Sequence, residues 1–303
     1  MPISYVTYQS INKQRWDECI DQASNGLIYG YSFYLDAMCS HWDALILDDY
    51  KAIMPLTYRK KYGIYYLYQP FCTASLGVFG NNITATIFNN FLQAVPNKFK
   101  YWDIYVNTKN VFTDSCFLQY QRINYVLNLQ DTYSNLYHHF KESTKRNIKR
   151  CVQLNCTVNT SVSIADVIAL AQQQAVRFSS VTTKQYQQFT QLYQYLSSKQ
   201  QAQIYGVQSA TGQLLAAAVF FIDKKRAYYI LVGNHPNSKV VGASHALINA
   251  FIKANAGKKL LLDFEGSDIK SLAFFYSSFG ASVEQYAGIQ LNNLPFFVKW
   301  FKK

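Results

Sequence analysis

The sequence has few of the residues that build metal or disulfide sites. Its six cysteines, at positions 19, 39, 72, 116, 151 and 156, include no Cys-x-x-Cys pair, and none is matched with nearby histidines at zinc spacing. The five histidines show no His-Glu-x-x-His pattern. We therefore expect reduced, mostly buried cysteines and no metal.

Long apolar runs are missing as well. The N-terminal stretch, MPISYVTYQSINKQRW, holds no apolar secretory core. Residues 62–97 carry no charge, but Asn, Gln, Thr, Pro and Gly interrupt them, which is not typical of a membrane span. These absences predict a cytoplasmic chain without a transmembrane segment.

Acidic residues are scarce relative to basic ones. The chain has 17 Asp and Glu against 29 Lys and Arg, a formal net charge of +12. This surplus favours phosphates, nucleic acid or anionic lipid headgroups as neighbours, although diffuse charge also serves solubility. Apolar residues, in contrast, make up half the chain, with 25 Tyr and 21 Phe. Such a composition is typical of a globular chain with a large core.

Apolar periodicity and turn residues predict an α+β chain in two similar halves. In the first half we expect helices at 16–23, 32–39 and 83–95, and strands at 44–48, 51–58, 63–68, 101–106 and 120–129. In the second half we expect helices at 131–152, 163–178, 186–196, 242–255 and 270–279, and strands at 203–209, 213–222, 227–232, 259–264 and 283–291.

The order of elements predicts two tandem units, 1–130 and 131–303, each a mixed, mostly antiparallel sheet flanked by helices. In the second unit, strand 259–264 should lie beside 227–232, because the apolar helix 242–255 can serve as the crossover that parallel strands need. No Gly/Ser-rich linker separates the halves, so we expect them to pack tightly.

The segment LAFFYSSFGA, residues 272–281, resembles a helix of the GNAT acyltransferase superfamily. Its matching positions are Ala273, Phe275, Tyr276, Phe279 and Gly280. The basic segment STKRNIKR, residues 143–150, is similar to one seen in FemAB-like chains, which carry two GNAT-like units in tandem. The resemblance covers about 131–292, and over 1–130 it rests on element order alone.

The resemblance implies transfer of an acyl or aminoacyl group to an amine, with aminoacyl-tRNA or acyl-CoA as the donor and no firmly implied cofactor. GNAT enzymes that use acyl-CoA carry a loop of the form Q/R-x-x-G-x-G/A, which binds pyrophosphate. Here that stretch runs from Lys239 to Ser244 and includes Gly242 and Ala243. It could cradle phosphate, or it could simply begin a helix that needs small residues.

Four residues are candidates for the chemistry. Tyr276 corresponds by resemblance to a tyrosine beside the leaving group, which it could protonate, although it could also be a core residue. Asp263 and Glu265, at the end of a predicted strand, would face the same side and could orient or deprotonate an amine, or be structural. His235 in a Gly-Asn-His-Pro loop could act as a base, or be merely exposed.

Two further groups are candidates for substrate binding. Lys145, Arg146 and Lys149 lie on the exposed side of a predicted helix and could meet tRNA, a diphosphate or an anionic membrane, or be a solvated surface. Tyr66, Tyr68 and Gln69, in the uncharged stretch, could line a substrate cleft or belong to an ordinary buried sheet.

The sequence thus favours a FemAB-like N-acyltransferase that acts on an amine of a peptide-like or cell-envelope precursor. Its partners would be that acceptor and possibly tRNA, without stable DNA binding. A CoA-dependent N-acetyltransferase that uses the 239–244 loop is one alternative. A catalytically inactive binding protein with the same fold is another, because a fold alone does not determine function.

Overall fold

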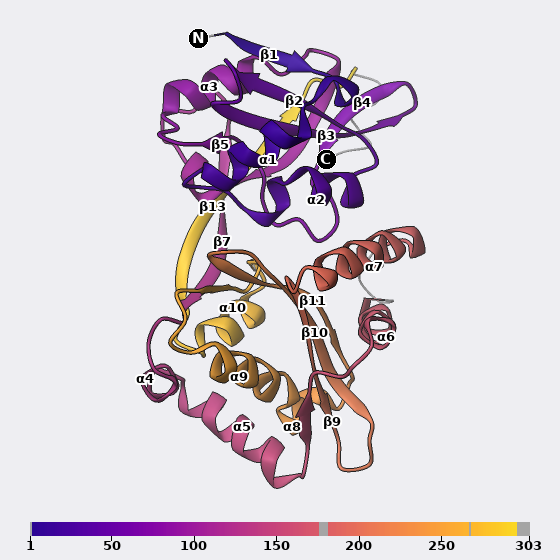
Figure 1. Ribbon diagram of the computed structural model, residues 1–303, viewed down its shortest axis with the longest axis vertical. Coiled ribbons are helices and arrows are strands. Elements are labelled where there is room, and N and C mark those ends of the chain that lie inside the picture. Colours follow the sequence, from indigo (N-terminus) through magenta and orange to yellow (C-terminus); the bar gives the residue numbers. More distant parts are fainter. Residues whose placement is uncertain (1, 176–180, 267, 296–303) are drawn as a thin grey trace. The chain divides into compact units, whose positions relative to one another are not determined.

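The computed structural model describes residues 2–175, 181–266 and 268–295, which form an α+β structure (Figure 1). The chain divides into two compact units. Unit 1 comprises residues up to 122 together with those from 285 onward, and unit 2 comprises 123–284. The chain passes between the units within two strands, β7 (Gln119–Asn128) and β13 (Ser282–Asn292).

Unit 1 contains a mixed sheet with the strand order β1-β2-β3-β4-β6-β13, and the short β5 pairs with β3. Neighbouring strands are antiparallel except β4 and β6, which are parallel and are joined by α3. The elements are β1 (Ile3–Val6), α1 (Lys13–Gln22), α2 (Ser32–Met38), β2 (Trp42–Leu47), β3 (Ala52–Lys61), β4 (Ile64–Tyr68), β5 (Phe79–Gly80), α3 (Ala85–Gln93) and β6 (Phe99–Val106).

The strands of unit 2 pair in the order β7-β12-β11-β10-β9-β8, with both parallel and antiparallel neighbours. Its elements are α4 (Tyr133–His138), α5 (Glu142–Gln153), β8 (Thr157–Asn159), α6 (Ile164–Ala175), α7 (Thr183–Ser198), β9 (Ala202–Gln208), β10 (Leu214–Ile222), β11 (Arg226–Asn234), α8 (Ser238–Val241), α9 (Ala243–Asn255), β12 (Leu261–Asp263) and α10 (Lys270–Ser277). β12 runs parallel to β11, and α9 lies between them in the chain. The predicted crossover is therefore confirmed.

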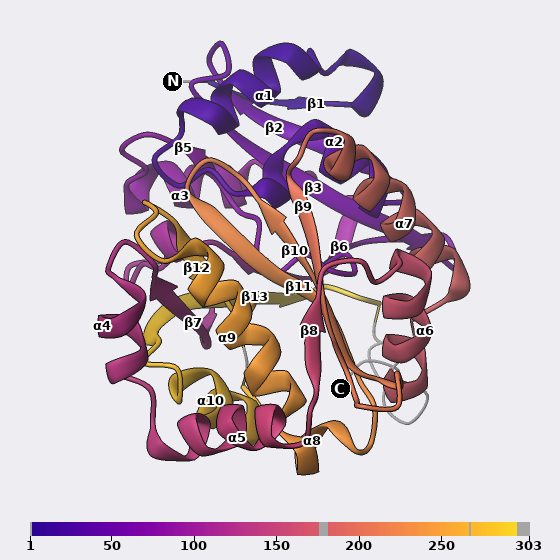
Figure 2. The same ribbon diagram turned by 60° about the horizontal axis from the view of Figure 1, so that its bottom comes forward.

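Helices cover both faces of the unit 2 strands. Figure 2 shows α5, α9 and α10 on one side of β8–β11, and α6 and α7 on the other. On the first side, Leu247 and Phe251 of α9 join a core that also holds Phe220, Phe264 and Phe279. On the second side, α6 approaches β11 so closely that a Cβ on Gly233 would lie 2.6 Å from the backbone nitrogen of Ala171. Neither face of this sheet is bare, as expected for a crossover fold.

The predicted long helix at 131–152 is wrong: the structure has two helices there. α4 ends at His138, and α5 begins at Glu142. Between them Phe140 enters the core, where its ring lies 5.2 Å from that of Phe279. The backbone N–H of Lys141 donates to the carbonyl of Ser278 at 2.9 Å. These tertiary contacts replace the helical bonds that a continuous helix would make.

Most other predicted elements are found, with shifted ends. β1, β5 and β8 are strands that the sequence did not predict, because each is very short. The predicted end of α6 near 178 lies outside the described residues. Gly280 has a left-handed backbone, with φ +77°, and α10 ends before it, at Ser277.

The two compact units differ in extent from the predicted ranges, 1–130 and 131–303, since the chain after 285 forms part of unit 1. The predicted ranges described two similar units that follow one another in the chain. That the two halves are related in this way stays a prediction. The structure itself is a mixed α+β fold with helix-flanked sheets.

Candidate functional site

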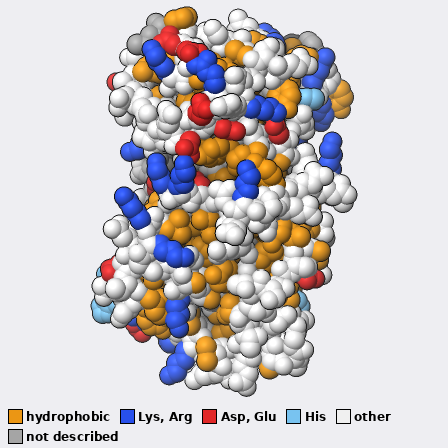
Figure 3. Space-filling view, in the orientation of Figure 1, with side chains coloured by type: hydrophobic (Ala, Val, Ile, Leu, Met, Phe, Trp, Pro, Cys, Tyr) orange, Lys and Arg blue, Asp and Glu red, His pale blue; other side chains and the backbone are white. Residues whose placement is uncertain are grey.

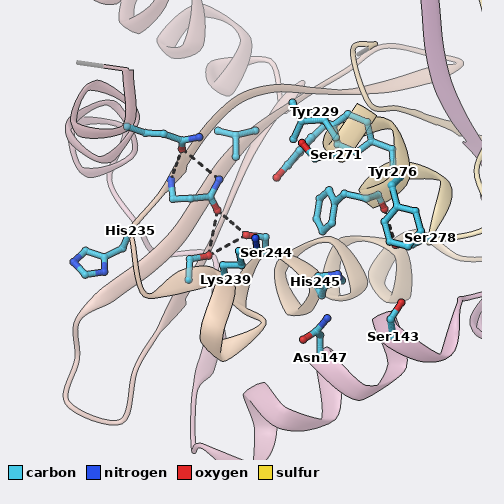
Figure 4. Close-up of a pocket in the computed structure, with 17 residues that line it drawn as sticks. Ser143, Asn147, Tyr229, His235, Lys239, Ser244, His245, Ser271, Tyr276 and Ser278 are labelled. Carbon is cyan, nitrogen blue, oxygen red and sulfur yellow. Dashed lines mark hydrogen bonds between the residues drawn. The ribbon is translucent and has the colours of Figure 1, made fainter. Parts of the chain in front are cut away.

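A cavity of about 660 Å³ lies within unit 2 (Figure 4). Six elements, or the loops next to them, contribute to its wall: α5, α6, β11, α8, α9 and α10. Its lining is mixed, with aromatic rings beside hydroxyl, amide and imidazole groups. The residues that carry the argument below are Asn147, Tyr229, Asn234, His235, Ser238, Lys239, Ser244, His245, Leu272, Phe274 and Tyr276.

The cavity occurs where two parallel strands part. β11 and β12 pair only through three positions, the last of which joins Tyr228 to Asp263. β12 ends there, whereas β11 continues to Asn234. Tyr229 and Asn234, which line the cavity, belong to this continuation of β11. Ligand sites are common at such openings beyond the ends of strands.

Tyr276 is brought into this cavity by α10. A place beside the leaving group, as the resemblance implies, stays a prediction. It is also a packed residue: its side chain is 8% exposed, and its ring stacks on Phe264 with 4.9 Å between centroids. Burial, together with the nearby Glu265 charge, raises the pKa of Tyr276 above its usual range. The phenol therefore stays protonated near neutral pH and can donate a hydrogen bond.

Tyr229 is a second buried tyrosine in the same wall, and the sequence analysis did not select it. It is 4% exposed, and its ring centroid lies 6.5 Å from that of Tyr276. Burial and the neighbouring Tyr276 raise its pKa as well. In the described part of the chain, neither hydroxyl has a hydrogen-bond partner. Two donors thus line one cavity without being used by the fold.

A hydrogen-bonded polar cluster forms another part of the wall. The hydroxyl of Ser244 donates to Asn234 Oδ1 at 2.6 Å, and that of Ser238 reaches the same oxygen at 3.3 Å. The backbone N–H of Asn234 donates to Gln174 Oε1 at 2.8 Å. Dashed lines in Figure 4 trace these bonds. Ser244 is thus placed in the cavity wall, but its hydroxyl is engaged by protein neighbours.

The segment from Lys239 to Ser244 combines a helical turn with a tight bend. α8 covers Ser238–Val241, and Gly242 has a left-handed backbone with φ +80° before α9 begins at the buried Ala243. A Cβ on Gly242 would lie 2.4 Å from the carbonyl oxygen of Asn147 on α5. Packing against α5 therefore already requires a glycine here. Lys239 is exposed and lines the cavity.

The two cavity histidines differ in their surroundings. His235 is tied to its own loop: Nδ1 accepts from the backbone N–H of Asn237 at 3.2 Å, and Nε2 lies 3.2 Å from Gln213 Nε2. In Figure 4 its ring points away from the tyrosines. The ring of His245 contacts that of Phe275 edge to face, at 4.7 Å between centroids. Burial lowers the pKa of His245 to about 4, so this imidazole is neutral near pH 7.

Asp263 is engaged by a buried ion-pair network. Its carboxylate accepts from Arg226 at 2.5 Å, from Asn124 Nδ2 at 2.9 Å and from the backbone N–H of Glu265 at 2.8 Å. Arg226 also pairs with Glu284 at 2.9 Å. These contacts account for Asp263 without a catalytic role. They agree with the structural alternative for this residue.

The expectation that Asp263 and Glu265 face the same side does not hold, since strand alternation stops before Glu265. β12 ends at Asp263, and Glu265 has a left-handed backbone with φ +68°. Neither carboxylate is among the residues that line the cavity, although the charge of Glu265 acts on Tyr276. A role for Glu265 in the chemistry stays a prediction.

The basic stripe on α5 is less uniform than predicted. Arg146 and Lys149 are exposed, as expected. Lys145, however, is partly covered: its ammonium group pairs with Glu142 at 2.9 Å and donates to the carbonyl of His138 at 3.2 Å. Asn147 of the same helix lines the cavity. Phosphate binding by the stripe stays a prediction.

The polar residues predicted to line a substrate cleft in the first half are half-buried on or next to β4. The Gln69 side chain holds two backbone groups, accepting from Tyr105 N–H at 3.0 Å and donating to the Thr73 carbonyl at 2.8 Å. The ring of Tyr68 lies 4.2 Å from the guanidinium carbon of Arg59 and 6.3 Å from the ring of Tyr66. These contacts agree with the sheet alternative, and substrate binding here stays a prediction.

Comparison with known proteins shows which of them share this fold. Neither the family models nor the curated proteins match this chain. Among solved structures, FemX superimposes with a TM-score of 0.67, at 11% identity and over 100% of both chains. The chain shares its fold with FemX. It therefore has the fold expected from its resemblance to the FemAB-like branch of the GNAT superfamily.

Two further structures support this assignment. L-PGS from Bacillus licheniformis matches with a TM-score of 0.57, at 11% identity, over 96% of this chain and 95% of that one. The C-terminal domain of a putative lysylphosphatidylglycerol synthetase from Agrobacterium fabrum matches with a TM-score of 0.56, at 11% identity, over 91% and 90%. At such identities the likeness concerns the fold alone.

The sequence analysis missed several residues of the site. Tyr229, Asn234 and Ser238 all line the cavity with Tyr276. Tyr229 lies within an apolar strand, YYILV, where it reads as a core residue. Asn234 and Ser238 lie on either side of the selected His235, so the polar loop was recognised, and a role for His235 itself stays a prediction. Only the end of β12 relative to β11 reveals which of these side chains face open space.

Proposed function

We propose that the chain is a FemX-like acyltransferase that transfers an aminoacyl or acyl group to an amine of a peptide-like or cell-envelope precursor. The chemistry would take place in the unit 2 cavity. The observation that carries this proposal is the pair of buried, protonated tyrosines, Tyr276 and Tyr229, in a cavity of a FemX-like fold. The fold supports acyl transfer, and the tyrosines supply the donors that it requires.

In the proposed reaction the acceptor nitrogen attacks the carbonyl carbon of the donor. The C–N bond forms, the bond to the leaving oxygen or sulfur breaks, and the proton lost by nitrogen balances the proton gained by the leaving group. Tyr276 would donate a hydrogen bond or its proton to the leaving oxygen. His245 is a neutral imidazole in the same wall and can accept a hydrogen bond from the attacking amine.

An ester donor fits this site better than a thioester. The alkoxide released from aminoacyl-tRNA is a stronger base than a thiolate, so it needs the proton of a tyrosine more. Two residues of the 239–244 segment already have structural roles, since Gly242 packs on α5 and Ser244 donates a hydrogen bond to Asn234. The segment therefore fits binding of the CoA pyrophosphate less well. We therefore favour aminoacyl-tRNA over acyl-CoA as the donor.

The proposed class of acceptor molecule rests on the proteins that this chain resembles. The FemAB resemblance implies an amine of a peptidoglycan precursor, and the FemX-like fold supports this choice. The lysylphosphatidylglycerol synthetase likeness makes a lipid hydroxyl group a second acceptor to test. A location in the cytoplasm and the absence of stable DNA binding remain part of the proposal.

A transfer assay tests the proposal. The purified chain would be mixed with tRNA charged with labelled amino acids, or with labelled acetyl-CoA, and with UDP-linked muropeptides or phosphatidylglycerol as acceptors. We expect label from charged tRNA to appear on the muropeptide, and this transfer to fall in Tyr276→Phe. Transfer from acetyl-CoA alone would favour the CoA-dependent alternative. Tight binding of an acceptor without transfer from either donor would favour a binding protein.

A further inference from the structure

Exposed apolar side chains lie on two of the elements that contribute to the cavity wall, α10 and α8. On and just before α10, Ile269 is 61% exposed, Leu272 39% and Phe274 58%. On α8, Val240 is 61% exposed. Leu272 and Phe274 line the cavity, and Val240 follows Lys239, which also lines it. We call these four side chains the apolar rim. Single exposed apolar residues are ordinary, but a group around one opening is not.

Lysines accompany the apolar rim. The ammonium group of Lys141 lies 4.3 Å from the ring centroid of Phe274. Lys239 and Lys270 are exposed and adjoin Val240 and Ile269 in the chain. Two acidic residues adjoin this group in the chain. Asp268, before Ile269, accepts from the backbone N–H of Ile123 at 3.4 Å, and Glu142, after Lys141, pairs with Lys145 at 2.9 Å. Figure 3 shows orange apolar and blue basic side chains close together on the face of unit 2 that it draws. The rim is therefore apolar and positively charged.

We propose that the apolar rim and its three lysines form a docking surface for an anionic phospholipid bilayer. Apolar side chains can enter the boundary between headgroups and acyl chains, while lysines keep their ammonium groups among anionic headgroups. Among the described residues no helix is long and apolar enough to cross a membrane, so this contact would be peripheral and reversible. Docking would bring the cavity opening to the level of the headgroups.

The chemistry of the rim favours a lipid surface over RNA. RNA is held by basic side chains at phosphates and by aromatic rings that stack on bases. The lysines and Phe274 would suit either partner. Val240, Ile269 and Leu272 are aliphatic and offer RNA neither charge nor a stacking surface, whereas a bilayer gives each of them an apolar medium. The aliphatic residues thus distinguish the two partners.

Vesicle sedimentation tests the proposal without any turnover. The full chain would be incubated at low salt with vesicles of phosphatidylcholine mixed with phosphatidylglycerol, and with vesicles of phosphatidylcholine alone. We expect stronger binding to the anionic vesicles. Val240→Asp combined with Ile269→Asp alters only side chains outside the cavity lining and should weaken binding by about tenfold or more. Lys239→Glu and Lys270→Glu should each weaken it by about fivefold.

Matched variants elsewhere serve as controls. Leu118→Asp changes an apolar residue in unit 1 that is 81% exposed, and Lys184→Glu with Lys199→Glu changes two exposed lysines, one on α7 and one directly after it. All three substitutions should leave vesicle binding within about twofold, and melting curves should show that every variant is folded. If the wild type does not bind anionic vesicles, or if the apolar double variant binds them as well as the wild type does, the proposal is wrong. The second result would indicate general electrostatic attraction, of a kind that tRNA would share.

Discussion

The two units differ in how their buried polar groups are hydrogen-bonded. In unit 1, Asn107 is 2% exposed, and its side chain bonds to Asn25, to Asn110 and to the backbone of Leu76, Val78 and Lys109. In the unit 2 cavity, the hydroxyls of Tyr229 and Tyr276 have no partner among the described residues. Groups that hold backbone segments together cannot also serve a substrate. Groups that are buried but unused can.

A pocket in unit 1 reinforces the contrast. It measures about 440 Å³ and includes Asp43, Tyr58 and Lys98. The carboxylate of Asp43 accepts from the hydroxyl of Tyr5 and from the backbone N–H of Tyr8, and it lies 3.6 Å from Lys98. Its charged groups are therefore paired with each other. A cavity alone does not make a catalytic site. The pocket in unit 1 and the cavity in unit 2 differ in whether their polar groups are already paired within the protein.

The largest expected effect comes from removing one unused hydroxyl in unit 2. Tyr276→Phe keeps the ring that stacks on Phe264 and removes only the phenolic oxygen. If Tyr276 is the proton donor, turnover should fall by roughly 10²–10⁴-fold, a typical contribution of general acid catalysis, with little change in melting temperature. Steady-state kinetics and thermal unfolding measure the two quantities.

The control for this change is Tyr195→Phe. Tyr195 lies on the exposed side of α7, and its hydroxyl contacts Lys199 at 2.6 Å. This variant should keep full activity. A Tyr276→Phe enzyme with wild-type turnover on its true substrate would make Tyr276 a core residue, and the contrast between the units would then lose its functional meaning.

The next effect in size belongs to unit 1 and concerns stability. Asn107→Ala would leave buried backbone carbonyls of Leu76 and Val78 without these side-chain donors. Each carbonyl keeps one other donor, the backbone N–H of residue 107 for Leu76 at 2.9 Å and Asn25 Nδ2 for Val78 at 2.8 Å. We expect the free energy of unfolding to fall by about 2–4 kcal/mol, because several buried side-chain hydrogen bonds are lost together. Urea denaturation measures this loss. The exposed Asn90→Ala on α3 should change stability by less than about 0.5 kcal/mol. Equal behaviour of the two variants would contradict the structural role.

Sequence reasoning was most successful where periodicity is long. The helix at 242–255 and the strands around it were predicted with their pairing, because Leu247 and Phe251 mark an apolar face that a crossover needs. The break at Phe140 was missed, since helical periodicity continues through it and only the packing against Phe279 reveals the interruption. Tertiary contacts decided that boundary.

The site was predictable only in part. Tyr276 was found through family resemblance, and the structure places it in the cavity. Asp263 attracted attention as a carboxylate at a strand end, but its partner Arg226 lies 37 residues away in the chain. No local pattern shows that this charge is paired. Tyr229 escaped notice for the opposite reason, because a tyrosine in an apolar strand looks fully packed.

A smaller effect on stability should appear as a pH dependence of unit 2. The pKa of His245 is about 4 in the folded chain and about 6.5 when unfolded, so the unfolded state binds the proton first as pH falls. The folded chain should lose stability between pH 6.5 and 4, by up to about 3 kcal/mol from this group. Above pH 7 the contribution is complete.

Comparing wild type with His245→Gln isolates the contribution of His245 to the free energy of unfolding. Urea denaturation at several pH values would give the difference in unfolding free energy between the two proteins, in which the titration of other groups largely cancels. We expect this difference to change by about 3 kcal/mol in favour of the variant as pH falls from 7 to 4. A difference that is constant with pH would show that the imidazole is open to solvent, and the cavity would then be wetter than its aromatic wall indicates.

The smallest effect on stability is expected from the α5 stripe. Changing Lys145, Arg146 and Lys149 to Glu alters a helix face in which two of the three residues are exposed, so melting should shift little. If the stripe contacts tRNA phosphates, affinity should drop at low salt, and the slope of log affinity against log salt should become shallower by up to about 2 for three contacts. Fluorescence anisotropy over a salt series measures both.

The pairing of Lys145 with Glu142 sharpens this last test. Because Lys145 already has an acidic partner, Arg146→Glu and Lys149→Glu alone should produce most of the loss in affinity. Lys184→Glu with Lys199→Glu, on and directly after α7, carries the same change of charge and should leave the slope near that of the wild type. If both pairs lower affinity equally, the net charge of the chain attracts RNA without a specific surface. If neither pair does, α5 is a solvated helix face, and the donor must be held by the cavity itself.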